Sequence, residues 1–201
     1  MYRDDMPRIR EYAHANPDNL VQVGTFVLAT IQMPFYRMLN AMEDIKQKGT
    51  NSSYLFGSKR VGYAFMAENK ERLHSEMLAI FASGDNVECK LIELFVQIPG
   101  LGIPKAAFLA QLVGAETACL DTHNLARFGI DEKAFRLGAK VTVKTIRAKI
   151  AAYVETCRKF NTSEGWWNSW CEYVVNTSRN AGKFANAEEV SKLHCYALGL
   201  S

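Results

Sequence analysis

The sequence contains no long apolar run. Its longest runs, such as Phe26 to Ala29, are far shorter than the roughly 18 apolar residues that a membrane-spanning helix requires. Residues Met1 to Asp5 hold no apolar segment of the kind found in secretory signals. We therefore expect no membrane partner and an intracellular protein.

Clusters of cysteine are also absent. The five cysteines are scattered through apolar stretches, and no two of them form a CxxC pair. Metal and iron–sulfur sites need clustered ligands, so we expect no metal and no cofactor. The simplest interpretation is that the cysteines are buried thiols in a reducing compartment.

Repeats and low-complexity segments are missing as well, and the net charge is only +3. The 201 residues are 48% apolar and 22% charged, which is typical of a packed globular protein. This composition excludes a disordered or collagen-like chain. The length predicts a single domain, residues 1–201.

Apolar residues recur at spacings of three and four almost everywhere, so the sequence predicts an all-α fold with about eight to ten helices. Pro34 is expected to split a helical stretch that begins at Leu20 and ends at Lys48. The turn-rich residues 51–62 predict a long connection. Residues 141–143 look strand-like but are too short to form a strand.

Two segments resemble capping boxes that open helices, Asp85-x-x-Glu88 and Asn186-x-x-Glu189. The first would open a helix that ends near Ile98. A second helix is expected to begin at Pro104, because proline suits the first turn of a helix, and to stop at Gly114. The pattern therefore predicts a helix-hairpin-helix at about residues 87–113.

The turn of this hairpin reads Pro99-Gly100-Leu101-Gly102. Its glycines allow close approach of another surface, and its amides together with the following helix N-terminus form an anion site, for which phosphate is the usual ligand. Lys105 adds a positive charge in the first helical turn. The alternative is a plain helical hairpin whose glycines serve only the turn.

Asp121 follows the hairpin in the segment Asp121-Thr122-His123-Asn124. One interpretation is a helix N-cap, a common role for Asp. The other is a carboxylate near a phosphate-binding turn, where it would stabilise an oxocarbenium-like sugar or activate water. His123 would be a second polar group in that pocket, or a structural hydrogen-bonding residue.

The pattern PGLG-x-x-K-A, followed about twenty residues later by LDTH, resembles the helix-hairpin-helix DNA glycosylase superfamily, in its endonuclease III/MutY-like branch. The resemblance implies a compact helical glycosylase fold, a duplex DNA partner and a role in DNA repair. It also implies that Asp121 is the catalytic carboxylate and that Gly100, Leu101, Gly102 and Lys105 bind a DNA phosphate.

The resemblance extends upstream to residues 27–32, which resemble an early helix of the family. By that match Gln32 would be the wedge that enters the duplex when a base is flipped. Tyr36 is a further candidate for the base pocket, with packing between helices as the alternative. Members that also cleave the strand carry a lysine where this chain has Pro104, with Lys105 one residue later. We therefore expect cleavage of the N-glycosidic bond without a lyase step.

Two alternatives stay open. A phage group, the α-glutamyl/putrescinyl-thymine pyrophosphorylases, also has a DTHN-type segment, which is residues 121–124 here. That resemblance implies a transferase that modifies activated 5-hydroxymethyluracil in DNA, acting in the host cytoplasm. The other alternative is a helix-hairpin-helix protein that binds DNA without catalysis, which would need the glycines but not Asp121.

Charge and aromatic residues bear on the DNA hypothesis. Between Lys133 and Lys159 there are eight basic residues and one acidic residue, Glu155, which is the pattern expected of a surface that contacts DNA phosphates, or of a solvated helix face. Trp166, Trp167 and Trp170 are expected to pack in the core, with a stacking wall for a flipped base as the alternative.

Overall fold

The computed structural model describes residues 1–120, 122–131, 133–138 and 140–200, with the side chains of Thr122, His123 and Arg127 excepted. Over these residues the chain is helical and contains no strand, so the all-α prediction is confirmed. Eleven α-helices occur in the described ranges, somewhat more than the eight to ten expected. No helix in the same ranges is long and apolar enough to cross a bilayer.

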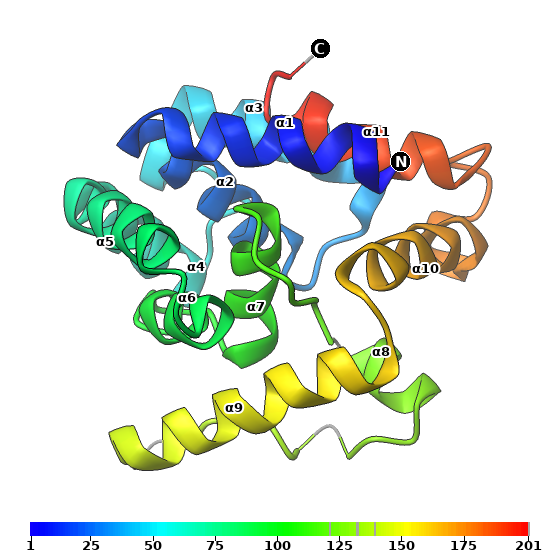
Figure 1. Ribbon diagram of the computed structural model, residues 1–201. Coiled ribbons are helices and arrows are strands. Elements are labelled where there is room, and N and C mark those ends of the chain that lie inside the picture. The colour runs from blue at the N-terminus through cyan, green and yellow to red at the C-terminus, as the bar shows by residue number, and fades with distance from the viewer. Residues whose placement is uncertain (121, 132, 139, 201) are drawn as a thin grey trace.

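Most of the helices follow one another through short connections (Figure 1). Three short 3-10 helices, η1 to η3, lie between them. The bounds are α1 Tyr2–Ala15, α2 Pro17–Thr30, η1 Phe35–Arg37, α3 Met38–Lys48, η2 Gly49–Asn51, α4 Ser58–Glu68, α5 Lys70–Ser83, α6 Val87–Phe95, α7 Ile103–Leu112, α8 Thr122–Arg127, α9 Val143–Phe160, α10 Ser163–Asn176, η3 Ser178–Asn180 and α11 Ala187–Ala197.

The helix α2 occupies the centre of the molecule and packs against α1, α3, α4, α5 and α7. Its apolar residues face every direction, as expected for a helix that is covered on all sides. Phe26, Val27 and Leu28 are fully buried. The helix ends at Thr30, and the chain then turns sharply through Gln32 and Pro34 before η1. The predicted split at Pro34 is confirmed.

The predicted helical hairpin is present as α6 and α7, although its first helix does not begin as expected. Asn86 is the N-cap of α6, with φ of +50°, and its side chain makes no capping hydrogen bond. Asp85 instead forms an ion pair with Lys90 at 2.8 Å. Asn86 rather than Asp85 occupies the N-cap position, one residue later than the capping box requires, so the first capping-box prediction is wrong.

The second capping prediction is confirmed in part, because Asn186 accepts a hydrogen bond from the amide of Glu189 and begins α11. The Glu189 carboxylate accepts from the amide of Ala185, so it does not complete the reciprocal box. The strand-like residues 141–143 belong to a helix start, where Thr142 accepts from the amide of Thr145 and opens α9.

The expected long connection at residues 51–62 is shorter than predicted, because α4 begins at Ser58. Gly62 on α4 lies directly against the hairpin turn: a Cβ placed there would overlap the carbonyl oxygen of Pro99 and touch the methyl groups of Leu28 at 3.2 and 3.3 Å. Glycine at this position therefore lets α4 brace the hairpin from one side.

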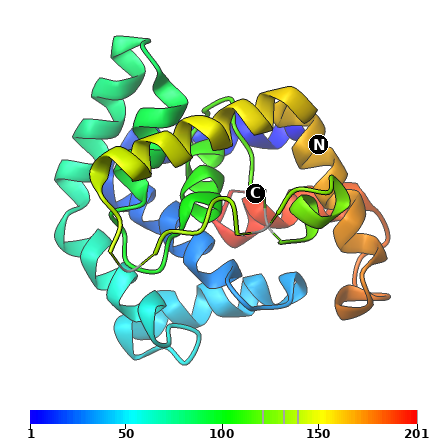
Figure 2. The same ribbon diagram turned by 90° about the horizontal axis from the view of Figure 1, so that it is seen from below.

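The helix α9 lies below α6 and α7 in Figure 1 and crosses in front of them in Figure 2. Its apolar stripe is buried at Ile150, Tyr153 and Val154, as the periodicity predicted. The Tyr153 hydroxyl donates to the carbonyl of Ala118 at 2.8 Å and accepts from the amide of Leu120 at 2.7 Å. These bonds fix the segment that leads toward α8.

Candidate functional site

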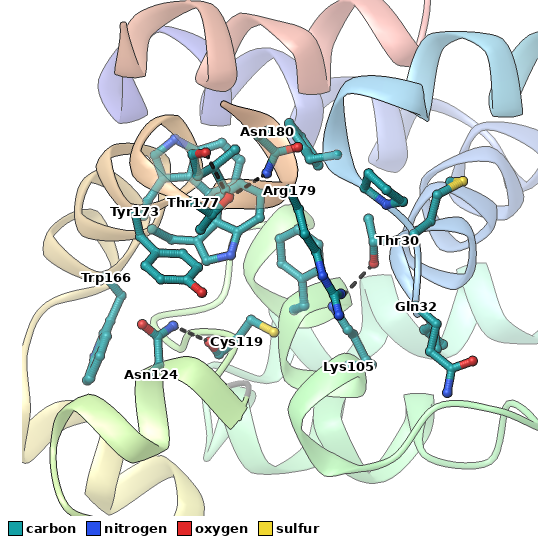
Figure 3. A pocket seen from close by; sticks show the side chains of 18 of the residues that line it. Thr30, Gln32, Lys105, Cys119, Asn124, Trp166, Tyr173, Thr177, Arg179 and Asn180 are labelled. Carbon is teal, nitrogen blue, oxygen red and sulfur yellow. Dashed lines mark hydrogen bonds between the residues drawn. The ribbon is translucent and has the colours of Figure 1, made fainter. Parts of the chain in front are cut away.

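A cavity of about 460 Å³ opens where the chain after α2, the hairpin, Cys119 with Asn124, α10 and η3 meet (Figure 3). Pockets of a few hundred Å³ are the size at which proteins hold small ligands or single nucleotides. The walls come from five separate parts of the sequence. Only the folded chain brings them together.

Aromatic side chains form much of the wall. Trp166, Trp167, Trp170 and Tyr173 come from α10, and Phe35 and Phe108 complete the surface. The ring of Trp170 meets Phe35 edge-on, with centroids 4.9 Å apart. The indole of Trp166 donates to the carbonyl of Cys157 at 3.0 Å, so its ring is fixed. The tryptophans thus pack in the core, as expected, and also line the cavity.

Three side-chain amides lie among these rings. Gln111 donates to the carbonyl of Ser163 at 3.1 Å, and Asn124 donates to the carbonyl of Cys119 at 2.9 Å. Asn180 donates to the hydroxyl of Thr177 at 2.9 Å. Because each amide nitrogen is anchored, the orientation of each amide group is set before a ligand arrives. An aromatic pocket with a few oriented polar groups suits a flat heterocycle.

Lys105 points into the cavity. Its ammonium lies 3.2 Å from the hydroxyl of Thr30 and 5.3 Å from the centre of the Phe108 ring, and its side chain is half-buried. The sequence predicted Lys105 as a phosphate contact on the hairpin. The structure places its charge on the cavity side of the hairpin.

Arg179 also lines the cavity, from η3, and is exposed. Sequence reasoning missed this residue, because a lone arginine in a connection carries no signal of where it will lie. Within the described lining residues the two cations face no Asp or Glu side chain.

The hairpin turn exposes backbone amides at Gly100 and Gly102. Among the described residues we find no acceptor for the backbone N–H groups of Gly100, Gly102 and Ile103. Gly100 takes φ of +92° and is exposed, as is Gly102, whereas Leu101 is only 4% exposed and anchors the turn in the core. Free amides at a helix N-terminus favour an anion. Gly100 also belongs to the cavity lining.

Asp121 lies outside the described residues, and so does the side chain of His123. The described chain on both sides of Asp121 borders the cavity, through Cys119 before it and Asn124 after it. Leu120 is fully buried and tied to α9 by its hydrogen bond to Tyr153.

Gln32 and Tyr36, the two candidates that follow α2, differ in their position relative to the cavity. Gln32 is exposed at the cavity rim, and its φ of +55° is unusual for a residue other than glycine. Such backbone strain tends to occur at functional positions. Tyr36 is not part of the cavity lining; its ring lies beside Arg37, at 5.6 Å, and Lys183, at 5.4 Å. The prediction of Tyr36 at the base pocket is therefore not supported by its position.

The basic segment that ends at Lys159 is partly neutralised by α6. Arg147 pairs with Glu93 at 2.7 Å, and Arg158 pairs with Glu88 at 2.9 Å. These cations join α9 to α6. Lys140 and Lys144 stay exposed and have no ion-pair partner in the described ranges. Fewer charges are available to a polyanion than the sequence indicated.

Behind the aromatic wall, His194 is fully buried and lies 4.3 Å from Trp167 and 4.8 Å from Phe35, between ring centres. Burial lowers the pKa of His194 to about 3, so the ring is neutral at physiological pH. Nearby, the indole of Trp167 donates to the hydroxyl of Ser191 at 3.0 Å, and that hydroxyl donates to the buried carboxylate of Asp5.

Within the described part of the chain, no group of three or more His, Cys, Asp or Glu side chains is placed to hold a metal ion. Comparison with known proteins gives no match to a family model, to a curated protein or to a solved structure. Function is therefore proposed from the site together with the sequence motifs.

Proposed function

We propose that this protein binds duplex DNA through the hairpin turn, receives an extruded base in the aromatic cavity and cleaves the N-glycosidic bond of that base. One observation carries the proposal: the hairpin and the cavity are parts of the same site. Gly100, whose amide has no acceptor among the described residues, and Lys105, from the first turn of α7, both belong to the cavity lining.

The binding step follows from the chemistry of the two parts. The exposed amides of Gly100 and Gly102, which have no acceptor among the described residues, would hold a backbone phosphate at the hairpin. A base in a duplex is reached only after it leaves the stack, and an aromatic cavity offsets the lost stacking. The anchored amides of Gln111 and Asn124 would then contact the edge of the base.

The chemical step is assigned to Asp121, on the resemblance of its segment to the glycosylase motif. A carboxylate beside the sugar would stabilise the developing positive charge at C1′ and orient the attacking water. A positioned base of this kind contributes about 10²–10⁴ in rate. No lyase step is proposed, because Pro104 occupies the place of the lysine and the Lys105 ammonium is bonded to Thr30.

The proposal is tested by mass spectrometry of duplex oligonucleotides incubated with the protein. The panel holds uracil, a thymine–guanine mismatch, oxidised and alkylated bases, and 5-hydroxymethyluracil with and without a diphosphate on its hydroxymethyl group. We expect loss of one base mass with the wild type and not with Asp121→Asn. Salt-sensitive binding with no mass change on any substrate would refute the reaction and favour a non-catalytic DNA-binding protein.

A second candidate is favoured by the cations that line the cavity. A transferase acting on diphosphate-activated 5-hydroxymethyluracil would break the carbon–oxygen bond to the diphosphate and form a carbon–nitrogen bond to an amine. The amine loses a proton, and the diphosphate leaves with its negative charge. Lys105 would neutralise that charge inside the cavity. In the same panel this reaction would keep the base in the oligonucleotide and shift its mass. The shift would require both the activated base and an added amine.

Binding at the hairpin is tested separately with Gly102→Glu and Gly102→Gln. Gly102 has ordinary extended backbone angles, and a Cβ there meets nothing closer than Pro104 at 3.9 Å, so both side chains fit. Glutamate would place a negative charge beside the free amides, whereas glutamine matches its size without the charge. We expect duplex affinity about tenfold lower for Gly102→Glu than for Gly102→Gln, with the difference shrinking as salt rises. Equal affinities would refute phosphate binding at the turn.

A further inference from the structure

Two cations line the cavity from different elements, Lys105 from α7 and Arg179 from η3 (Figure 3). The described residues that line the cavity include no carboxylate. Two positive charges that share a cavity repel each other, and each loses part of its hydration. A bound anion offsets both costs. Among the described lining residues no carboxylate offsets this repulsion, so the two cations are suited to an anionic ligand.

The immediate neighbours of these cations do not neutralise them. The Lys105 ammonium contacts a hydroxyl, of Thr30, and an aromatic face, of Phe108. Arg179 forms no ion pair in the described part of the chain. Other exposed cations of the protein do pair, as Arg3 does with Glu164 at 3.1 Å and Lys70 with Asp18 at 2.7 Å.

A third cation adds to the positive potential. Lys59 is only 3% exposed, and its ammonium lies 3.4 Å from the carbonyl of Ala29, next to the residue that Lys105 contacts. Burial lowers the pKa of Lys59, and the charge of Lys105 lowers it further, so the two ammonium groups sense each other. Gly100 of the hairpin turn also lines the cavity.

We propose that Lys105 and Arg179 form a clamp for one anion of the phosphate class at the mouth of the cavity. A guanidinium binds two phosphate oxygens through its planar fork, and an ammonium supplies a compact point charge. The aromatic walls lower the local dielectric and strengthen both interactions. The source of the anion rests on the proposed function: it is either the backbone phosphate of the extruded nucleotide or a phosphate that enters separately from the backbone.

The anion site is testable without DNA, because the three tryptophans of the chain all line this cavity and their emission reports on it. Inorganic diphosphate is titrated into the wild type, Lys105→Gln and Arg179→Gln. Lys46→Gln, an exposed position on α3 outside the cavity, removes the same charge as a control. We expect each clamp variant to bind diphosphate at least tenfold more weakly than wild type, and the control to stay within about twofold.

A second arm identifies the source of the anion. A duplex with an abasic analogue is compared with the same duplex in which the phosphate next to the analogue is an uncharged methylphosphonate. If the anion is the backbone phosphate, the methylphosphonate weakens wild-type binding about tenfold and has little effect on Arg179→Gln. If the phosphate enters separately, both duplexes bind alike and only diphosphate affinity depends on Lys105 and Arg179. Thermal unfolding verifies that each variant is folded.

The clamp is refuted if wild type, Lys105→Gln and Arg179→Gln respond identically to diphosphate and to both duplexes. The proposed function fails by a different result, namely equal duplex affinities for Gly102→Glu and Gly102→Gln together with no mass change in the oligonucleotide panel. The two failures are therefore distinguishable.

Discussion

Replacing Gly62 by alanine tests whether α4 braces the hairpin turn. In a solvent-exposed helix the change from glycine to alanine stabilises by about 1 kcal/mol, because alanine restricts the unfolded backbone and favours the helix. Here the added methyl group would overlap the carbonyl oxygen of Pro99, a backbone atom that has no rotamer to adopt, and would press on Leu28. The sign of the effect should therefore reverse.

The magnitude follows from the two opposing terms. Overpacking against a rigid neighbour costs about 3 kcal/mol at the upper end of the usual range, and helix propensity returns about 1 kcal/mol. The net loss is about 2 kcal/mol. For a chain of this length that corresponds to a lower Tm by roughly 4–8 °C.

Thermal unfolding followed by circular dichroism measures the shift, with Gly138→Ala as the control. A Cβ at Gly138 meets nothing within 4 Å, and its φ is not in the left-handed region, so this variant should be neutral or slightly stabilised. We also expect Gly62→Ala to weaken duplex binding, because the hairpin turn must shift. An equal or higher Tm for Gly62→Ala would show that α4 does not contact the turn as described.

Three further predictions concern the structure behind the cavity wall. Below pH 6.5 the free energy of unfolding of the wild type should fall by roughly 1 kcal/mol per pH unit as the pH falls toward 3, because unfolding lets His194 take up a proton. Urea unfolding across this pH range measures the effect, and His194→Phe should lack this component. Ser191→Ala removes the hydroxyl that the Trp167 indole and the Asp5 carboxylate share, so it should lower the free energy of unfolding by about 1–3 kcal/mol. The control Ser75→Ala, at an exposed position, should change it by less than about 0.5 kcal/mol. Burial raises the thiol pKa values to about 12, so iodoacetamide should label the following cysteines only after unfolding: Cys157, Cys171 and Cys195.

Much of the fold follows from local pattern. Periodic apolar residues predicted α9, α10 and the two helices of the hairpin, because their buried stripes are regular. The apolar pattern does not predict α1, because the buried face of this helix holds only Met6, Ile9 and Ala13 among apolar residues, with Asp5 buried beside them. The sequence predicts a turn at the start of α4, because residues 51–62 are rich in glycine and serine. Gly62 is required there by contact with Pro99, which the sequence does not reveal.

Part of the candidate site also follows from local sequence, and part depends on tertiary contacts. Motif spacing indicated the hairpin glycines, and the structure places Gly100 and Lys105 at a cavity. The direction of the Lys105 side chain depends on Thr30, which is 75 residues away in the sequence. Arg179 reaches the cavity only because α10 and η3 fold against the hairpin side. Contacts of this kind are tertiary, so no local pattern predicts them.

The central claim is that a base leaves the duplex and enters the cavity beside the hairpin. The most direct measurement places 2-aminopurine next to each base of the oligonucleotide panel and follows its emission, which rises when stacking with the neighbouring base is lost. The account predicts a saturable rise with wild type and with Asp121→Asn for at least one panel base, and a much weaker rise with Gly102→Glu at equal concentration. No rise for any base at concentrations that saturate binding would contradict it.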